Sequence, residues 1–271
     1  MSKNSIYKEL IIQYAQETCP IITKDDFLER YPDLSNSGFL STIKRMIASQ
    51  ELLRPWKGVY IVSPKENFEG TVHLREYLDF IMSKCKRGYY VTLYDAIAEL
   101  IPTYEIKDPS LYYVMVSDEG MSSREHGSTT PKLKHCYCNH FPKPYVYTRK
   151  TKFGKLNVAT AELLAIDLIS HSNTIGGLQE SVRLLDVIKS KLNFRRLQED
   201  IFEYKSIANV QRLGYIIENV LGKPAKAQPL YELLSKRCDF LQKKPLALGL
   251  PTDGCGFDKR WAILVNEELM K

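Results

Sequence analysis

Residues 21–64 have the sequence IITKDDFLERYPDLSNSGFLSTIKRMIASQELLRPWKGVYIVSP, and this stretch decides how the N-terminal part of the chain folds. It predicts two short helices followed by a strand pair. Thr23 can cap the first helix, and Asp25 and Asp26 would lie at the positive end of its dipole. Pro32 cannot continue that helix, so the chain must turn before the second helix begins.

The second helix is expected to have one apolar face and one polar face. Ser35 or Asn36 can cap its start. Four apolar side chains recur at helical spacing and would face a core: Phe39, Ile43, Met46 and Ile47. The opposite face carries short or cationic side chains: Ser37, Ser41, Lys44, Arg45 and Ser49. A helix with this outer face fits the major groove of DNA, where Arg and Lys contact guanine edges or phosphates.

A hairpin is predicted directly after this helix. Glu51–Arg54 and Gly58–Val62 alternate in polarity around a turn-rich Pro-Trp-Lys-Gly segment. Together with an amphipathic helix expected over residues 3–18, these elements predict a winged helix-turn-helix. The residues expected to contact DNA are Ser37, Ser41, Lys44, Arg45, Arg54, Trp56 and Lys57. The alternative is a three-helix bundle in which the same cations are only solvated.

The composition is that of an ordinary globular protein. The 271 residues are 44% hydrophobic and 26% charged, which argues against disorder and allows one large or two ordinary domains. The net charge of +6 fits an anionic partner without requiring one. The apolar runs are too short for a membrane span, and no apolar signal core follows the first residues. Because the six cysteines are scattered, a reducing, cytoplasmic location is expected.

A change in pattern after the hairpin predicts two domains. The polar stretch Lys65–Thr71 is the expected linker, which separates a DNA-binding domain of residues 1–66 from a larger domain of residues 67–271. Two helices are expected between residues 72 and 102, with a break at Gly88.

The larger domain is expected to combine a small mixed sheet with a helical bundle. Strands are predicted over residues 111–117 and within KLKHCYCNHF and PYVYTRKTKF. From Ala159 the period becomes helical, and four successive amphipathic helices, one of them over residues 194–206, predict a bundle. A shorter helix over residues 230–236 and a closing strand within residues 261–265 follow. The expected fold class is therefore α+β.

The segment between Glu125 and Glu162 contains no Asp or Glu. Its seven cations, interleaved with aromatic residues, are Lys132, Lys134, Lys143, Arg149, Lys150, Lys152 and Lys155. One interpretation is a basic sheet face that binds nucleic acid or an acidic protein. The alternative is an amphipathic sheet whose lysines occupy solvent or edge positions, where they discourage aggregation.

The sequence contains no recognisable catalytic constellation, which favours a binding protein over an enzyme, with no cofactor. Only one residue separates Cys136 from Cys138, whereas zinc knuckles usually have about two to four between their cysteines. Strand alternation would instead place both thiols on one face, which suits a core. No phosphate-binding loop, nucleophile elbow or HExxH pattern is present. Glu162 and Asp167 are five residues apart on a predicted helix and do not share a face.

Three segments resemble the AbiEi family, the antitoxins of type IV toxin–antitoxin systems. The first is the predicted wing, RPWKGVYIV at residues 54–62. The second is VATAELLAIDLISHSNTIGGLQESVRLLDVI at residues 158–188. The third is NVQRLGYIIENVLG at residues 209–222, which contains the QRLGY pattern. These segments follow one another in the family's order and extend over most of the chain.

The resemblance implies a two-part antitoxin. Its winged helix would bind inverted repeats in double-stranded promoter DNA and repress its own operon. Its C-terminal domain would neutralise a cognate nucleotidyltransferase-like toxin, without the need for a stable complex, in a system linked to abortive phage infection. The alternative left open is a stand-alone winged-helix regulator whose C-terminal domain senses a ligand or partner.

Overall fold

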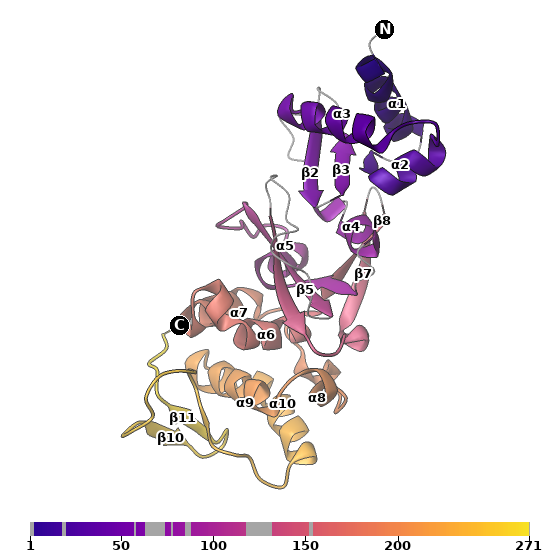
Figure 1. The fold of residues 1–271 in the computed structure, drawn as a ribbon. Helices are drawn as coiled ribbons and strands as arrows, with labels where there is room; N and C mark the ends of the chain where they lie inside the picture. The colour runs from indigo at the N-terminus through magenta and orange to yellow at the C-terminus, as the bar shows by residue number, and fades with distance from the viewer. Residues whose placement is uncertain are drawn as a thin grey trace.

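The computed structural model describes residues 3–17, 20–56, 58–62, 74–76, 78–84, 88–117, 132–151 and 154–270. Over these ranges the chain is a mixed α/β protein with several helices and three sheets. In Figure 1 the chain runs from the N-terminal helices at one end, through a central sheet, to a group of C-terminal helices at the other.

The described residues between 3 and 62, hereafter the N-terminal unit, form three helices and an antiparallel sheet of order β1-β3-β2. The elements in chain order are α1 (Lys3–Glu17), β1 (Ile21–Thr23), α2 (Lys24–Arg30), α3 (Asn36–Ala48), β2 (Leu52–Trp56) and β3 (Val59–Val62). Both predicted helix starts are confirmed. The Thr23 side chain accepts a hydrogen bond from the Asp26 N–H at 3.1 Å and caps α2. Ser35, rather than Asn36, caps α3 and accepts from the Gly38 N–H at 3.1 Å.

The sheet of the N-terminal unit is buried on both faces. Ile22 and Tyr60 belong to the core that the three helices enclose. Their neighbours Ile21, Val59 and Ile61 belong to the larger core formed by the rest of the chain. Successive side chains on a strand point to opposite faces, so this sheet connects the two cores. The sequence predicted the hairpin but not β1, and the expected linker Lys65–Thr71 lies outside the described residues.

A five-stranded mixed sheet occupies the middle of the molecule (Figure 1). Its strand order is β6-β5-β4-β8-β7, in which β5 and β6 are parallel, β4 and β8 are parallel, and the other pairs are antiparallel. The elements of this region are 3-10 turn η2 (Leu74–Glu76), α4 (Leu78–Lys84), β4 (Tyr89–Val91), α5 (Leu93–Leu100), β5 (Leu111–Ser117), β6 (Lys132–Cys138), 3-10 turn η4 (Lys143–Tyr145), β7 (Val146–Thr151) and β8 (Gly154–Ala159).

Two strands of this sheet were not predicted. The central strand β4 occupies a stretch in which the sequence indicated only a break at Gly88, and all three of its residues are buried. Its aromatic and β-branched composition was the available signal. Strand β8 lies just before the predicted helical region, and the helix expected from Ala159 begins at Ala161. The strands predicted within residues 111–117, 132–141 and 144–153 are confirmed as β5, β6 and β7.

The C-terminal part is mainly helical and ends in a small sheet of order β10-β11-β9. Its elements are α6 (Ala161–Ser170), 3-10 turn η5 (Ser172–Ile175), α7 (Leu178–Ile188), 3-10 turn η6 (Phe194–Arg196), α8 (Ile201–Tyr204), α9 (Ile207–Tyr215), a π-helical segment (Ile216–Val220), α10 (Pro224–Arg237), β9 (Lys244–Pro245), β10 (Gly256–Asp258) and β11 (Ile263–Val265). The helix expected over residues 230–236 is the longer α10, and β11 confirms the closing strand.

The single helix predicted from Phe194 to Ser206 is wrong. The chain instead forms η6 and the four-residue α8, with an extended residue at Leu197. Contacts with Tyr145 explain the interruption: its hydroxyl accepts from the Gln198 N–H at 3.0 Å and donates to Asp200. These long-range bonds replace helical ones.

Within the described ranges, every helix is too short or too polar to span a lipid bilayer.

Candidate nucleic-acid interface

Helix α3 is fixed in place by α1 and by its own buried face. The Tyr7 hydroxyl on α1 accepts from the Ser35 N–H at 2.8 Å, directly at the cap of α3. A Cβ on Gly38 would lie 2.4 Å from the Tyr7 ring, so only glycine permits this close approach. Phe39 and Ile43 are buried as predicted, together with Met46, whereas Ile47 is only partly buried.

The opposite face of α3 is exposed. All four of its predicted DNA contacts lie there: Ser37, Ser41, Lys44 and Arg45. The Arg45 guanidinium lies along the helix, where it donates to the Ser41 carbonyl at 3.4 Å and to the Thr42 hydroxyl at 3.2 Å. Among the described residues, neither Lys44 nor Arg45 pairs with a carboxylate. The face therefore presents two cations that a phosphate or a base edge can reach.

The predicted wing is less completely described. Arg54 on β2 is partly buried, and its Nε lacks a hydrogen-bond partner within the described part of the chain. Trp56 is the last residue of β2, and the β2–β3 register shifts between Leu53 and Trp56. Lys57 lies outside the described residues. Four of the seven predicted contacts thus share one helix face, and Arg54 is not as exposed as expected.

The cations of the 126–161 segment do not form one surface. Lys132 and Lys134 lie on β6, while Arg149 and Lys150 lie on β7, and these two strands are the opposite edges of the five-stranded sheet. Four strand spacings separate the two edges, about 19 Å. Lys155 on β8 is the direct cross-strand neighbour of Lys150. Lys143 is exposed in η4, and Lys152 lies outside the described residues.

One of these cations is already paired. Arg149 Nη1 lies 2.6 Å from Glu99 Oε2 on α5, and Arg75 contacts the same carboxylate at 3.3 Å. The Glu99 side chain is only 5% exposed. Arg149 therefore neutralises an internal acid, which makes it a poor candidate for a partner-binding residue.

Cys136 and Cys138 are buried free thiols on β6, as the alternation predicted. Burial raises the pKa of Cys136 to about 12 and that of Cys138 to about 11, which disfavours the thiolate form needed for metal binding. The described residues contain no group of three or more His, Cys, Asp or Glu side chains arranged to hold a metal ion.

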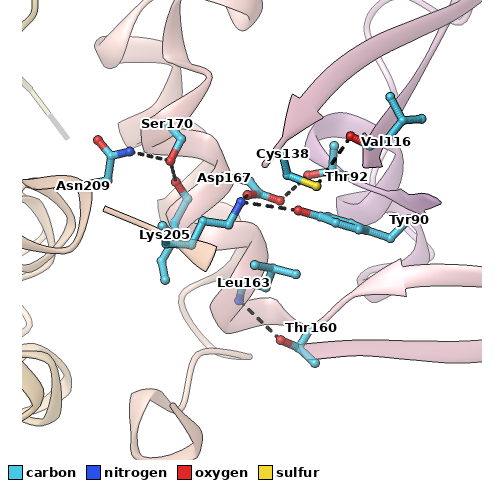
Figure 2. A network of polar contacts seen from close by, with 11 residues as sticks. Tyr90, Thr92, Val116, Cys138, Thr160, Leu163, Asp167, Ser170, Lys205 and Asn209 are labelled. Atoms are coloured by element: carbon cyan, nitrogen blue, oxygen red, sulfur yellow. Dashed lines mark hydrogen bonds and ion pairs between the residues drawn. The ribbon is translucent and has the colours of Figure 1, made fainter. Parts of the chain in front are cut away.

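A buried ionic network, missed in the sequence, links the sheet to the C-terminal helices. Figure 2 shows the Lys205 ammonium between the Asp167 carboxylate of α6 and the Tyr90 hydroxyl of β4. Thr92 donates to the second Asp167 oxygen at 2.9 Å. Burial, followed by the Asp167 charge, raises the pKa of Tyr90, so its hydroxyl remains neutral. No local sequence pattern signals this cluster, because its members are separated by up to 115 positions.

The QRLGY pattern on α9 proves to be a packing element. The Gln211 amide donates to the carbonyls of Gln242 and Trp261 at 3.0 and 2.9 Å. Arg212 Nε donates to the Pro245 carbonyl at 2.9 Å. A Cβ on Gly214 would lie 2.0 Å from the Trp261 ring, so the indole packs directly on the α9 backbone. These three residues attach the β9–β11 segment to the helices.

The comparisons with known proteins support the fold. No protein-family model matches this chain, and no curated protein matches it. Among solved structures, the fold is similar to the crystal structure of the RV2827C protein from Mycobacterium tuberculosis, with a TM-score of 0.64 and 13% sequence identity. The match covers 93% of this chain and 88% of that chain. At this identity the similarity concerns the fold alone.

Proposed function

We propose that the N-terminal unit is a winged helix-turn-helix that binds double-stranded promoter DNA through α3. The observation that carries this proposal is the exposed, carboxylate-free face of α3, whose cap is bonded to the Tyr7 hydroxyl and which is followed directly by the β2–β3 hairpin. In this family of folds the second helix of the helix-turn-helix enters the major groove. Ser41, Lys44 and Arg45 would then contact base edges or phosphates, and the hairpin would contact the adjacent backbone.

The wider proposal is a type IV antitoxin of the AbiEi kind. The support is the sequence resemblance over three segments together with the element order of the N-terminal unit, helix–strand–helix–helix–hairpin. Two copies of the chain would bind inverted repeats in their own promoter, with half-sites spaced by about 34 Å or a multiple of it. The remainder of the chain would counter a nucleotidyltransferase-like toxin.

DNA binding is tested by measuring the affinity of the full chain for its own promoter region with fluorescence anisotropy. Lys44→Ala with Arg45→Ala should lower this affinity by about 2 kcal/mol or more, roughly thirty-fold, and reduce its salt dependence. The matched control is Lys236→Ala with Arg237→Ala, which removes the same exposed Lys-Arg pair from the end of α10. Equal effects of the two double variants, or none, would reject α3 as the recognition helix.

Antitoxin activity is tested by co-expression with the adjacent gene. Growth arrest by that gene alone, relieved by the full chain, supports the antitoxin. Relief by the Lys44→Ala/Arg45→Ala variant as well would place neutralisation outside α3. If the adjacent gene is not toxic, or the full chain gives no relief while promoter binding persists, the chain is a stand-alone regulator.

A further inference from the structure

A pocket of about 280 Å³ lies far from α3, where three C-terminal helices meet the segment after β9. Its walls come from the end of α6, the start of α7, one side of α9 and residues 246–250. This volume is near the lower end of the range for small-molecule sites in proteins. The proposed DNA-binding function does not use this pocket.

Arg212 supplies the positive charge of the pocket. Its side chain lines the cavity, although the residue is only 6% exposed. Nε donates to the Pro245 carbonyl and Nη1 donates to the Asn209 amide oxygen, both at 2.9 Å. Nη2 makes no hydrogen bond to any described residue, and no described carboxylate forms an ion pair with the guanidinium. Burial lowers the pKa of Arg212.

A buried cation without a counter-ion is costly, because desolvation is not offset by an opposite charge. An oxyanion bound at Nη2 would supply that charge, and a guanidinium binds carboxylate and phosphate oxygens with strong, directional hydrogen bonds. The start of α7 adds to the attraction. Gly177 and Leu178 line the pocket, and no described side chain caps this eleven-residue helix. The acid in its first turn, Glu180, is paired with Arg183, so the N-terminal N–H groups of the helix can attract an anion in the pocket.

The other lining residues determine the chemistry of the rest of the ligand. Leu248 and Leu250 form an apolar wall, although they are 68% and 47% exposed in the free protein. The acid in the lining is Glu267, which has no hydrogen bond or ion pair with the described residues. It lies beyond ion-pair distance of Arg212 and would repel a bound anion.

We propose that this pocket binds a small compound whose terminal oxyanion, a carboxylate or a phosphate, contacts Arg212 while its apolar part lies against Leu248 and Leu250. The ligand would cover the exposed leucines and neutralise the guanidinium at the same time. Because Arg212 also holds β9 through the Pro245 carbonyl, occupancy would strengthen the attachment of β9 to α9.

The test is isothermal titration of the full chain with benzoate, phenyl phosphate and inorganic phosphate, with benzyl alcohol as the neutral control. Benzoate or phenyl phosphate should bind saturably, more tightly than inorganic phosphate, and benzyl alcohol should not bind. The tighter of the two aromatic anions identifies the headgroup. Absence of saturable binding by both aromatic anions, or equal binding of benzyl alcohol, would overturn the proposal.

Variants locate the bound anion. Arg212→Gln should weaken binding roughly ten-fold or more, since it removes a charge-assisted contact. Because this change also affects the contact with Pro245, Leu248→Glu provides a second test: it alters an exposed side chain and places a carboxylate at the rim. It should also weaken binding, without changing promoter affinity. Unchanged anion affinity in both variants would overturn the proposal.

Removing the negative charge of Glu267 should change the anion affinity in the opposite direction. Glu267→Gln should strengthen binding of either aromatic anion several-fold, because a repulsive charge is removed. The matched control is Glu268→Gln, an exposed neighbour outside the lining, which should leave the affinity unchanged. Weaker binding in Glu267→Gln would place the anion elsewhere and contradict the assignment to Arg212.

Discussion

The N-terminal unit keeps the cations of its α3 face in solvent, whereas the region from residue 74 onward buries or pairs several of its own. Lys44 and Arg45 are exposed and have no carboxylate partner among the described residues. Lys205 and Arg212 are buried, and Arg149 is paired with Glu99. A solvated cation contributes little to stability but is free to bind an anion, while a buried cation also stabilises the fold through its protein partners. Substitutions in the two regions should therefore affect different measurements.

The largest effect on stability is expected for Lys205→Met. The change leaves the fully buried Asp167 carboxylate with hydroxyl partners, Thr92 and Tyr90, but without a described cation, which should cost about 3–5 kcal/mol of unfolding free energy. Urea denaturation followed by circular dichroism measures this loss. The matched control is Lys189→Met, which breaks a half-exposed pair with Asp186 and should cost about 1 kcal/mol or less. Equal losses would contradict the importance of burial.

The second effect is a pH dependence of the unfolding free energy that arises from Asp95. Asp95, in the first turn of α5, is 3% exposed and accepts from the Tyr113 N–H at 2.7 Å. Burial raises its pKa to about 7, well above the value of the unfolded chain. The native state therefore retains a proton that the unfolded state has lost, and stability should fall as pH rises from about 4 to about 7, by at most about 1.4 kcal/mol per pH unit.

Asp95→Asn should remove most of this slope, because the amide oxygen still accepts from Tyr113 but does not ionise. The measurement is the unfolding free energy by urea at several values of pH. Asp25→Asn is the control from the N-terminal unit: it also lies in the first turn of a helix, but its side chain is 89% exposed. An unchanged slope in Asp95→Asn would show that Asp95 is ionised in the native state.

A smaller effect is expected at the sheet edge. Arg149→Ala should cost about 1 kcal/mol, because Glu99 is nearly buried but retains its contact with Arg75. Lys150→Ala removes an exposed neighbour that lies opposite another lysine, and its stability should be unchanged or slightly higher. Thermal and urea unfolding of the two variants distinguish these roles. A larger loss of unfolding free energy in Lys150→Ala than in Arg149→Ala would contradict the stabilising role assigned to Arg149.

The same contrast explains how much the sequence could predict. The α3 face was predicted correctly because residues three and four apart are neighbours on any helix, so local spacing is sufficient. The basic segment was clustered in sequence but divided in space, since strand order depends on long-range pairing that places β6 and β7 at opposite edges. The burial of Lys205 and Arg212 is likewise a property of tertiary packing, and neither residue differs from a surface cation in its local sequence.

The smallest effect on stability is expected for the Lys44→Ala/Arg45→Ala variant, which should have a large effect on promoter binding. Lys44→Ala with Arg45→Ala removes exposed side chains, and among the described residues Arg45 bonds to Ser41 and Thr42 of its own helix. Alanine also has the higher helix propensity, so the unfolding free energy should remain within about 0.5 kcal/mol of the unsubstituted chain. Urea denaturation and promoter titration of the same preparation give its unfolding free energy and its DNA affinity. A loss of several kcal/mol would mean that the two cations belong to the fold, and reduced DNA binding could then no longer be attributed to the α3 face.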